Sequence, residues 1–87
     1  VAVGSGALYA NTTGTSNAAL GTFSLISSTT GSYNTGIGHR AAQSATTASN
    51  LTAVGYQSLN SLTTGDNNTA IGYQAGQNIT TGANNIM

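Results

Sequence analysis

The feature that most constrains the fold of this sequence is a motif that recurs every 17 residues along the whole chain. Its clearest copy is TAIG at residues 69–72, and the equivalent tetrapeptides are TAVG at 52–55, TGIG at 35–38, AALG at 18–21 and VAVG at 1–4. Five copies therefore occupy residues 1–17, 18–34, 35–51, 52–68 and 69–85, and residues 86–87 begin a sixth. Self-similarity at a short fixed period indicates a repeat architecture, in which each unit buries its apolar surface against its neighbours. We therefore predict a single repeat segment over residues 1–87.

The start of each copy has the alternation of a β-strand. The third residue is apolar in every copy and defines the apolar file: Val3, Leu20, Ile37, Val54 and Ile71. Its neighbours define the small file (Ala2, Ala19, Gly36, Ala53 and Ala70) and the corner glycines (Gly4, Gly21, Gly38, Gly55 and Gly72). Successive side chains of a strand point to opposite faces, so one face carries the apolar file and the other almost no side chain. We expect the apolar file to point inward and fill a narrow core, with equivalent residues about 4.8 Å apart.

A second strand is expected to begin near Ala7, Ser24, Ala41, Ser58 and Ala75 in the five copies. The residues that follow define the leucine file: Leu8, Leu25, Ala42, Leu59 and Gly76. Its leucines are expected to complete the core, which Ala42 and Gly76 leave thinner. Leu62 and Ile79 add apolar bulk further along the fourth and fifth copies.

Each copy ends with a threonine pair and a polar turn. The pairs are Thr12-Thr13, Thr29-Thr30, Thr46-Thr47, Thr63-Thr64 and Thr80-Thr81. The turn glycines Gly14, Gly31, Gly65 and Gly82 follow, with Ala48 in the third copy, and we expect them to supply a positive φ. The asparagine file (Asn17, Asn34, Asn68 and Asn85, with Leu51 in the third copy) is expected to close the turn and to form hydrogen bonds from coil to coil.

The third copy, residues 35–51, is the irregular one. It contains Gly36, Ala48 and Leu51 as exceptions, and it also contains His39 and Arg40. We expect it to be the least well packed coil or the place where the surface changes character.

Charged residues make up 2% of the sequence, against about 25% in an ordinary globular domain. Zero net charge argues against nucleic acid as a partner, because that requires a basic face, and equally against an acidic lipid surface. No apolar run approaches the roughly 20 residues of a membrane helix, so no membrane insertion is expected. Thr, Asn, Gly and β-branched residues dominate without a 3.6-residue period, which excludes a helical fold. The predicted fold class is all-β, a parallel β-solenoid of five 17-residue coils.

The segments NTAIGYQA (68–75) and TTGDNNTAIG (63–72) resemble the head repeats of trimeric autotransporter adhesins, and resemble more closely the repeats of phage tail-fibre and related surface-fibre proteins. The resemblance covers the whole chain. It implies a left-handed parallel β-roll in which three chains associate along their length. On this resemblance Ile71 and its equivalents point into the roll, and Ala70 and Gly72 with theirs lie on the tighter face, toward a neighbouring chain. The period is a few residues longer here because of the threonine pair.

Titratable side chains are too few for a catalytic or metal site. His39 is the only histidine and Asp66 the only acidic residue, and they belong to different copies, whereas such sites need several convergent groups. Residues 36–41, GIGHRA, satisfy the G-x-G-x-x-A form of a dinucleotide fingerprint, but no helix pattern follows them. We therefore predict that the chain is not an enzyme and has no catalytic residue, metal site or cofactor.

These patterns favour a structural rod segment of an extracellular fibre, filament, adhesin or phage tail fibre, at a virion or cell surface or outside the cell. The expected partner is the chain itself, as a trimer or a head-to-tail filament, because a solenoid end exposes unpaired strand edges. The alternative function is a binding module with a flat face. The threonine columns would then bind ice, or Tyr56 and Tyr73, which share a column with His39, would bind a cell-surface glycan.

Overall fold

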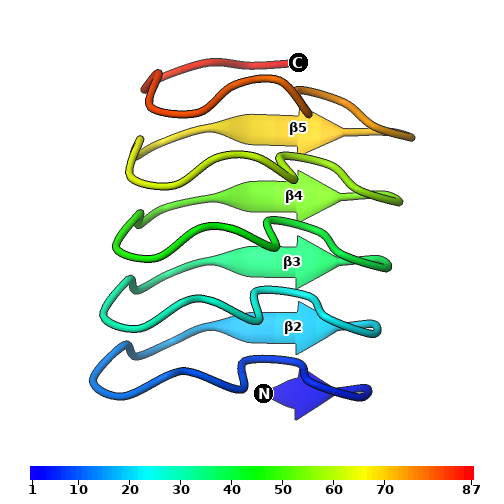
Figure 1. The fold of residues 1–87 in the computed structure, drawn as a ribbon. Helices are drawn as coiled ribbons and strands as arrows, with labels where there is room; N and C mark the ends of the chain where they lie inside the picture. The colour runs from blue at the N-terminus through cyan, green and yellow to red at the C-terminus, as the bar shows by residue number, and fades with distance from the viewer.

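The computed structural model describes all residues from Val1 to Met87 and is a stack of five similar coils without any helix (Figure 1). Each coil contributes one short strand: β1 (Ala2–Val3), β2 (Ala18–Leu20), β3 (Thr35–Ile37), β4 (Thr52–Val54) and β5 (Thr69–Ile71). The strands form one parallel sheet in chain order, and each pairs residues 17 apart, such as Ala53 with Ala70. The prediction of an all-β parallel solenoid with 17-residue coils is confirmed. A bridge between Thr69 and Ile86 shows that the last two residues continue the stack in register.

The wall opposite the sheet consists of tight turns, so the prediction of a second strand beginning at Ala7 and its equivalents is wrong. In the second coil, Ser24 N–H donates to the Gly21 carbonyl at 3.2 Å and Ser28 N–H donates to the Leu25 carbonyl at 3.1 Å. Leu25 N–H joins this wall to the next coil through the Ala41 carbonyl, at 2.9 Å. A strand cannot form here because the leucine file adopts the left-handed region, with φ of 51° at Leu25.

Positive φ angles follow the repeat. Thirteen non-glycine residues have positive φ, and they fall in three columns. The columns are Phe23, Arg40, Gln57 and Gln74; Leu8, Leu25, Ala42 and Leu59; and Ser16, Tyr33, Asn50, Asn67 and Asn84. The left-handed region costs an ordinary residue roughly 1–2 kcal/mol, so it persists only where the surroundings impose it. Because Phe23 and Gln74 adopt the same conformation, the stacking of the coils, and not the side chain, determines the backbone here.

The corner glycines end the strands, and where another corner glycine follows in the next coil there is no room for a side chain. Their φ angles run from +123° at Gly4 to +129° at Gly72. A Cβ atom on Gly38 would lie 2.7 Å from the carbonyl oxygen of Gly55 in the next coil. Backbone conformation and the close approach of the next coil therefore both require glycine.

The core is filled from the turn wall, and the prediction that the apolar file points inward is wrong. From the second coil on, the small file is buried, whereas Leu20 and Ile71 are 50% and 61% exposed. The reason is space: a Cβ atom on Gly36 would lie 3.0 Å from Cγ of Leu25, which crosses the interior. The strand can therefore offer the core only alanine or glycine. The face assignment taken from the family resemblance is wrong for the same reason, since Ile71 lies outside and Ala70 inside.

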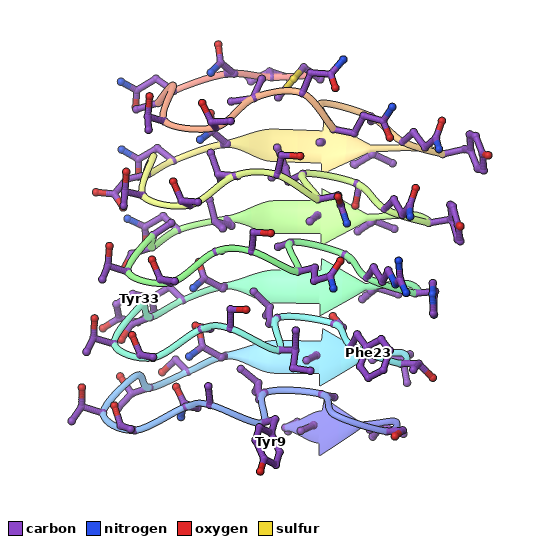
Figure 2. All side chains as sticks on the ribbon, viewed as in Figure 1. Tyr9, Phe23 and Tyr33 are labelled. Carbon is purple, nitrogen blue, oxygen red and sulfur yellow. The ribbon has the colours of Figure 1, made fainter.

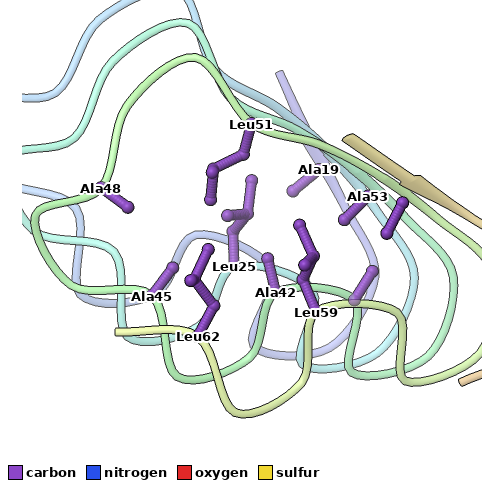
Figure 3. Packing of buried hydrophobic residues seen from close by; sticks show 11 residues of the cluster. Ala19, Leu25, Ala42, Ala45, Ala48, Leu51, Ala53, Leu59 and Leu62 are labelled. Carbon is purple, nitrogen blue, oxygen red and sulfur yellow. The ribbon is translucent and has the colours of Figure 1, made fainter. Parts of the chain in front are cut away.

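The leucine file fills the interior as predicted (Figure 3). Leu25 and Leu59 are fully buried, Leu62 packs beside them, and Leu8 and Ile79 lie partly buried against the cluster. The leucine file of one coil and the small file of the next coil fill the same space, so a small residue in one file allows a larger residue in the other. Where the leucine file contains Gly76, the larger Met87 stands at the small-file position of the next coil. Its Sδ atom would lie 2.8 Å from a Cβ atom on Gly76.

The asparagine file runs inside the stack and forms hydrogen bonds between coils, as predicted. Asn34 Nδ2 donates to the Ala48 carbonyl at 2.8 Å, and Asn34 Oδ1 accepts from Leu51 N–H at 3.0 Å. Asn68 makes the equivalent bonds, to the Gly82 carbonyl at 2.7 Å and from Asn85 N–H at 2.9 Å. These bonds satisfy polar groups that the stack removes from water.

The turn glycines do not have positive φ, so that prediction is wrong. The left-handed residue of this turn is the one before the asparagine file, for example Tyr33 at 60°. Glycine is needed because the next coil approaches closely. A Cβ atom on Gly31 would overlap the carbonyl oxygen of Ala48.

The third coil is not loosely packed. Ala42, Ala45, Ala48 and Leu51 are all buried, so the first of the two expectations for this coil is not met. The second is met, because His39 and Arg40 lie partly exposed and give this coil a different surface.

Candidate interaction surfaces

The outer sheet face consists of the side chains that the strands direct away from the core. It contains two columns: the apolar file and, two residues earlier, Val1, Ala18, Thr35, Thr52 and Thr69. Neither column contains a charged side chain. A single exposed apolar residue needs no explanation, but the apolar file is exposed in four coils and partly exposed at Val54, and contiguous apolar patches mark interaction sites.

A ladder of aromatic rings lies beyond the corner glycines. His39 stacks on Tyr56 with 5.6 Å between ring centroids, and Tyr56 stacks on Tyr73 with 5.3 Å. Phe23 extends the ladder toward the second coil, 6.1 Å from His39. Figure 2 shows Phe23 at the end of the coils toward which the strand arrows point, whereas Tyr33 lies at the opposite end. The shared column predicted for His39, Tyr56 and Tyr73 is confirmed.

Beside the rings runs the amide column, which we define as Arg40, Gln57 and Gln74. Gln74 Nε2 donates to Gln57 Oε1 at 3.1 Å. The Arg40 guanidinium carbon lies 5.8 Å from the centroid of the Phe23 ring, within the range of a cation–π interaction. Its Nε atom is buried and has no hydrogen-bond partner.

The two threonines of each pair have different roles. The first donates its hydroxyl to the carbonyl of the equivalent threonine in the next coil, for example Thr29 to Thr46 at 3.3 Å and Thr63 to Thr80 at 3.1 Å. The second is exposed in every coil: Thr13, Thr30, Thr47, Thr64 and Thr81. One outward threonine per coil therefore forms a single column on the turn side.

These features form extended surfaces, since the molecule has no pocket and no group of three His, Cys, Asp or Glu side chains that could hold a metal ion. No protein-family model, curated protein or solved structure matches the chain. No helix of the structure is long and apolar enough to cross a bilayer. The functional inference therefore rests on the surfaces themselves.

The titratable residues singled out from the sequence lie in different surroundings. His39 is part of the ring ladder, whereas Asp66 Oδ1 accepts from Ser49 N–H at 2.8 Å in the turn region. Residues 36–41 run from β3 around the corner, and no helix follows them. His39 and Asp66 thus make their contacts in separate parts of the coil.

The two ends of the stack carry unpaired backbone groups that complement each other. At the N-terminal end these are the N–H groups of Gly4, Gly6 and Ser16 and the carbonyls of Ala7 and Thr12. At the C-terminal end they are the N–H groups of Gly76 and Thr80 and the carbonyls of Ile71, Tyr73 and Ala83. In the interior of the stack, the equivalent groups bond to one another, so each end offers the partners that the other lacks.

The outer sheet face was missed by sequence reasoning. Alternation shows that a strand has two different faces but not which one is inside. A signal was available: Leu25, Leu59 and Leu62 compete with the apolar file for one narrow interior, and both sets cannot fit.

Proposed function

We propose that this chain is a structural rod segment of an extracellular fibre, of the adhesin or phage tail-fibre kind, and that the outer sheet face packs against further copies of the same chain. The observation that carries the proposal is the apolar file, with one apolar side chain at the same place in every coil, exposed in four coils and partly exposed at Val54. Asn, Ser, Thr and Gln supply many polar side chains, whereas charged residues make up only 2% of the sequence.

A second copy is the partner that the file fits best. Its side chains have the same spacing of one coil, so ridges and grooves of two copies coincide over the full length of contact. A partner without this period would match at one coil and mismatch at the next. The absence of charged side chains from this face removes the repulsion that otherwise keeps sheet faces apart.

The expected strength depends on the number of coils. Burying a Val, Leu or Ile side chain contributes about 1.5–3 kcal/mol, and the apolar file is roughly half exposed, so each coil contributes about 1 kcal/mol per chain. Association costs on the order of 4–15 kcal/mol in lost freedom of motion. Five coils are therefore near the threshold, and longer arrays associate firmly.

End-to-end stacking is a second mode of self-association, supported by the complementary backbone groups at the two ends. A separate copy would meet Ile86 and Met87 where its own Val1 and Ala2 belong, because these residues already continue the stack. We therefore expect the end-to-end contact between separate chains to be weaker than the lateral one. A head-to-tail contact does not close, so it would produce filaments.

Light scattering tests the lateral proposal. The mass should rise with concentration for the 87-residue chain, and a ten-coil chain made by joining two copies of residues 1–85 should associate at concentrations at least about tenfold lower, since its interface is twice as long. Ile37→Lys should abolish association, because it places a charge in the contact. Thr47→Lys, on the turn side, is the matched control and should leave the mass unchanged. If the ten-coil chain stays monomeric, or if both lysine variants act alike, the proposal is wrong.

A binding module with a flat face is the second candidate function. The exposed threonine column favours it, because the second threonine of each pair stands free in all five coils. The glycan version of this hypothesis, in which a sugar stacks on a tyrosine ring, has less support, since both faces of the Tyr56 ring are covered by His39 and Tyr73. Thermal hysteresis of the parent chain and of Thr64→Tyr tests the ice form: absence of hysteresis in the parent removes it.

A further inference from the structure

Side chains of the amide column can donate hydrogen bonds from coil to coil, but this chain of bonds is interrupted at Arg40, which cannot accept one. Gln74 donates to Gln57 Oε1, which leaves Gln57 Nε2 without an acceptor in the protein. A glutamine at position 40 could accept from that group and continue the ladder, but a guanidinium has donors only. Two groups of unpaired donors therefore occupy adjacent coils of one column.

Nothing in the protein satisfies these donors. Arg40 carries the only positive side chain, and its buried Nε atom has no partner. The only acidic side chain, Asp66, accepts from the Ser49 backbone elsewhere. Because Nε is buried, an external acceptor reaches the guanidinium through its terminal Nη groups, which, like Gln57 Nε2, are not buried and make no hydrogen bond in the protein.

We propose that Arg40 and Gln57 bind the carboxylate of an acidic sugar. Arginine presents parallel N–H groups that match the two oxygens of a carboxylate, and contact with the Phe23 ring restricts the orientation of the guanidinium. The Gln57 amide adds a donor one coil away. This site is independent of lateral association, and it gives the sugar-binding alternative a defined chemistry.

The neighbouring ring column indicates a sugar and not a bare anion. His39 and Tyr56 directly precede Arg40 and Gln57 in the chain, so rings and donors form parallel columns. Stacking leaves the Tyr56 ring edge and hydroxyl as its free parts, and the residue is 42% exposed. A phenol hydroxyl both donates and accepts, which suits the hydroxyls of a sugar. Copies packed side by side would present several such sites and gain in avidity.

Nitrogen-15 NMR at low salt tests the proposal on the intact chain, with glucuronate, acetate and glucose as probes. Glucuronate should shift the Arg40 Nε–Hε and Gln57 side-chain signals with a dissociation constant on the order of millimolar. Acetate should bind at least about tenfold more weakly, and glucose should leave the Arg40 signal unchanged.

Arg40→Gln is the matched variant, because Gln57 and Gln74 show that the column accepts glutamine at φ of 55° and 54°, close to the 61° of Arg40. It should weaken glucuronate binding at least about tenfold. Arg40→Lys keeps the charge without the parallel donors, so its affinity for glucuronate should lie between those of the parent chain and Arg40→Gln.

Three outcomes would overturn the proposal: no response to glucuronate, equal responses to acetate and glucuronate, or undiminished binding by folded Arg40→Gln. The titration is repeated in the Ile37→Lys background, so a failure of lateral association cannot be mistaken for a failure of this site.

Discussion

The third and fourth coils fill the same interior with different residues. The fourth coil has Gly65 and Asn68 in its turn, and Asn68 Nδ2 donates to the Gly82 carbonyl of the next coil. The third coil has Ala48 and Leu51 at the same two places, and Leu51 makes no such bond to Gly65. One coil uses a buried amide and a bare backbone, and the other uses a methyl group and an apolar side chain.

We infer from this difference that the two exceptions depend on each other. A Cβ atom on Gly65 would overlap the Gly82 carbonyl, which the Asn68 amide holds in place. Leu51 of the third coil has no amide to donate to the Gly65 carbonyl, which accepts from Asn68 Nδ2 of its own coil at 3.1 Å, and we expect this to leave room for the Ala48 methyl. Leu51 also supplies volume where the leucine file contains only Ala42.

The largest expected effect comes where the two coils do not differ, at the corner glycines. Gly55→Ala should lower the free energy of unfolding by about 4 kcal/mol or more, from backbone strain and from overlap with the next coil. A Cβ atom there would lie 2.5 Å from the Gly72 carbonyl oxygen. Urea unfolding followed by circular dichroism measures the loss.

Gly72→Ala is its control, because φ is +129°, against +128° at Gly55, but an added Cβ atom would meet only Ala75, at 3.9 Å. Its free energy of unfolding should fall only by the cost of the backbone strain, about 1–3 kcal/mol. Equal losses for the two variants would mean that coil spacing does not matter at the corner.

The dependence of Ala48 on Leu51 predicts an intermediate effect in the fourth coil. Gly65→Ala alone should cost about 2–3 kcal/mol by overpacking, and Asn68→Leu alone about 1–3 kcal/mol through lost buried hydrogen bonds. The double variant reproduces the third coil and should cost at least about 1 kcal/mol less than the sum. Additive losses in urea unfolding would show that the two exceptions are unrelated.

The smallest effect tests whether the coils are equivalent on the outside. Asn50 Nδ2 donates to Asn67 Oδ1 and Asn67 Nδ2 to Asn84 Oδ1, both at 3.0 Å on the exposed surface. Asn50→Ala and Asn67→Ala should each cost about 1 kcal/mol, because alanine tolerates the left-handed region less well than asparagine and the exposed bonds add little. A difference above about 0.5 kcal/mol would mean that the third coil is also distinct at its surface.

The period made much of the fold predictable. Residues 17 apart had to lie in equivalent places, which fixed the strand register, the buried leucines and the coil-to-coil bonds of Asn34 and Asn68. The turn wall was not predictable in this way. Its left-handed residues include Phe23, Arg40 and Gln57, which share no side-chain property that favours that conformation.

The surfaces were predictable only in part. The ring column followed from the register, because His39, Tyr56 and Tyr73 are 17 residues apart. The outer sheet face required knowing which side of the strand the leucines occupy. The unpaired donor at Gln57 required the direction of the bond between Gln74 and Gln57, which a list of residue types does not contain.

The uniform register also has a consequence for how such a stack changes length. Each turn of the stack advances about 4.8 Å for 17 residues, or about 0.3 Å per residue, against about 3.3 Å per residue in a stretched thread. Most of the polypeptide therefore contributes to the width and stiffness of the stack, and little of it to its length. Recombination between equivalent positions of two repeats would add or remove whole turns in frame, so the length of the stack would change in steps of 17 residues while each face kept its columns.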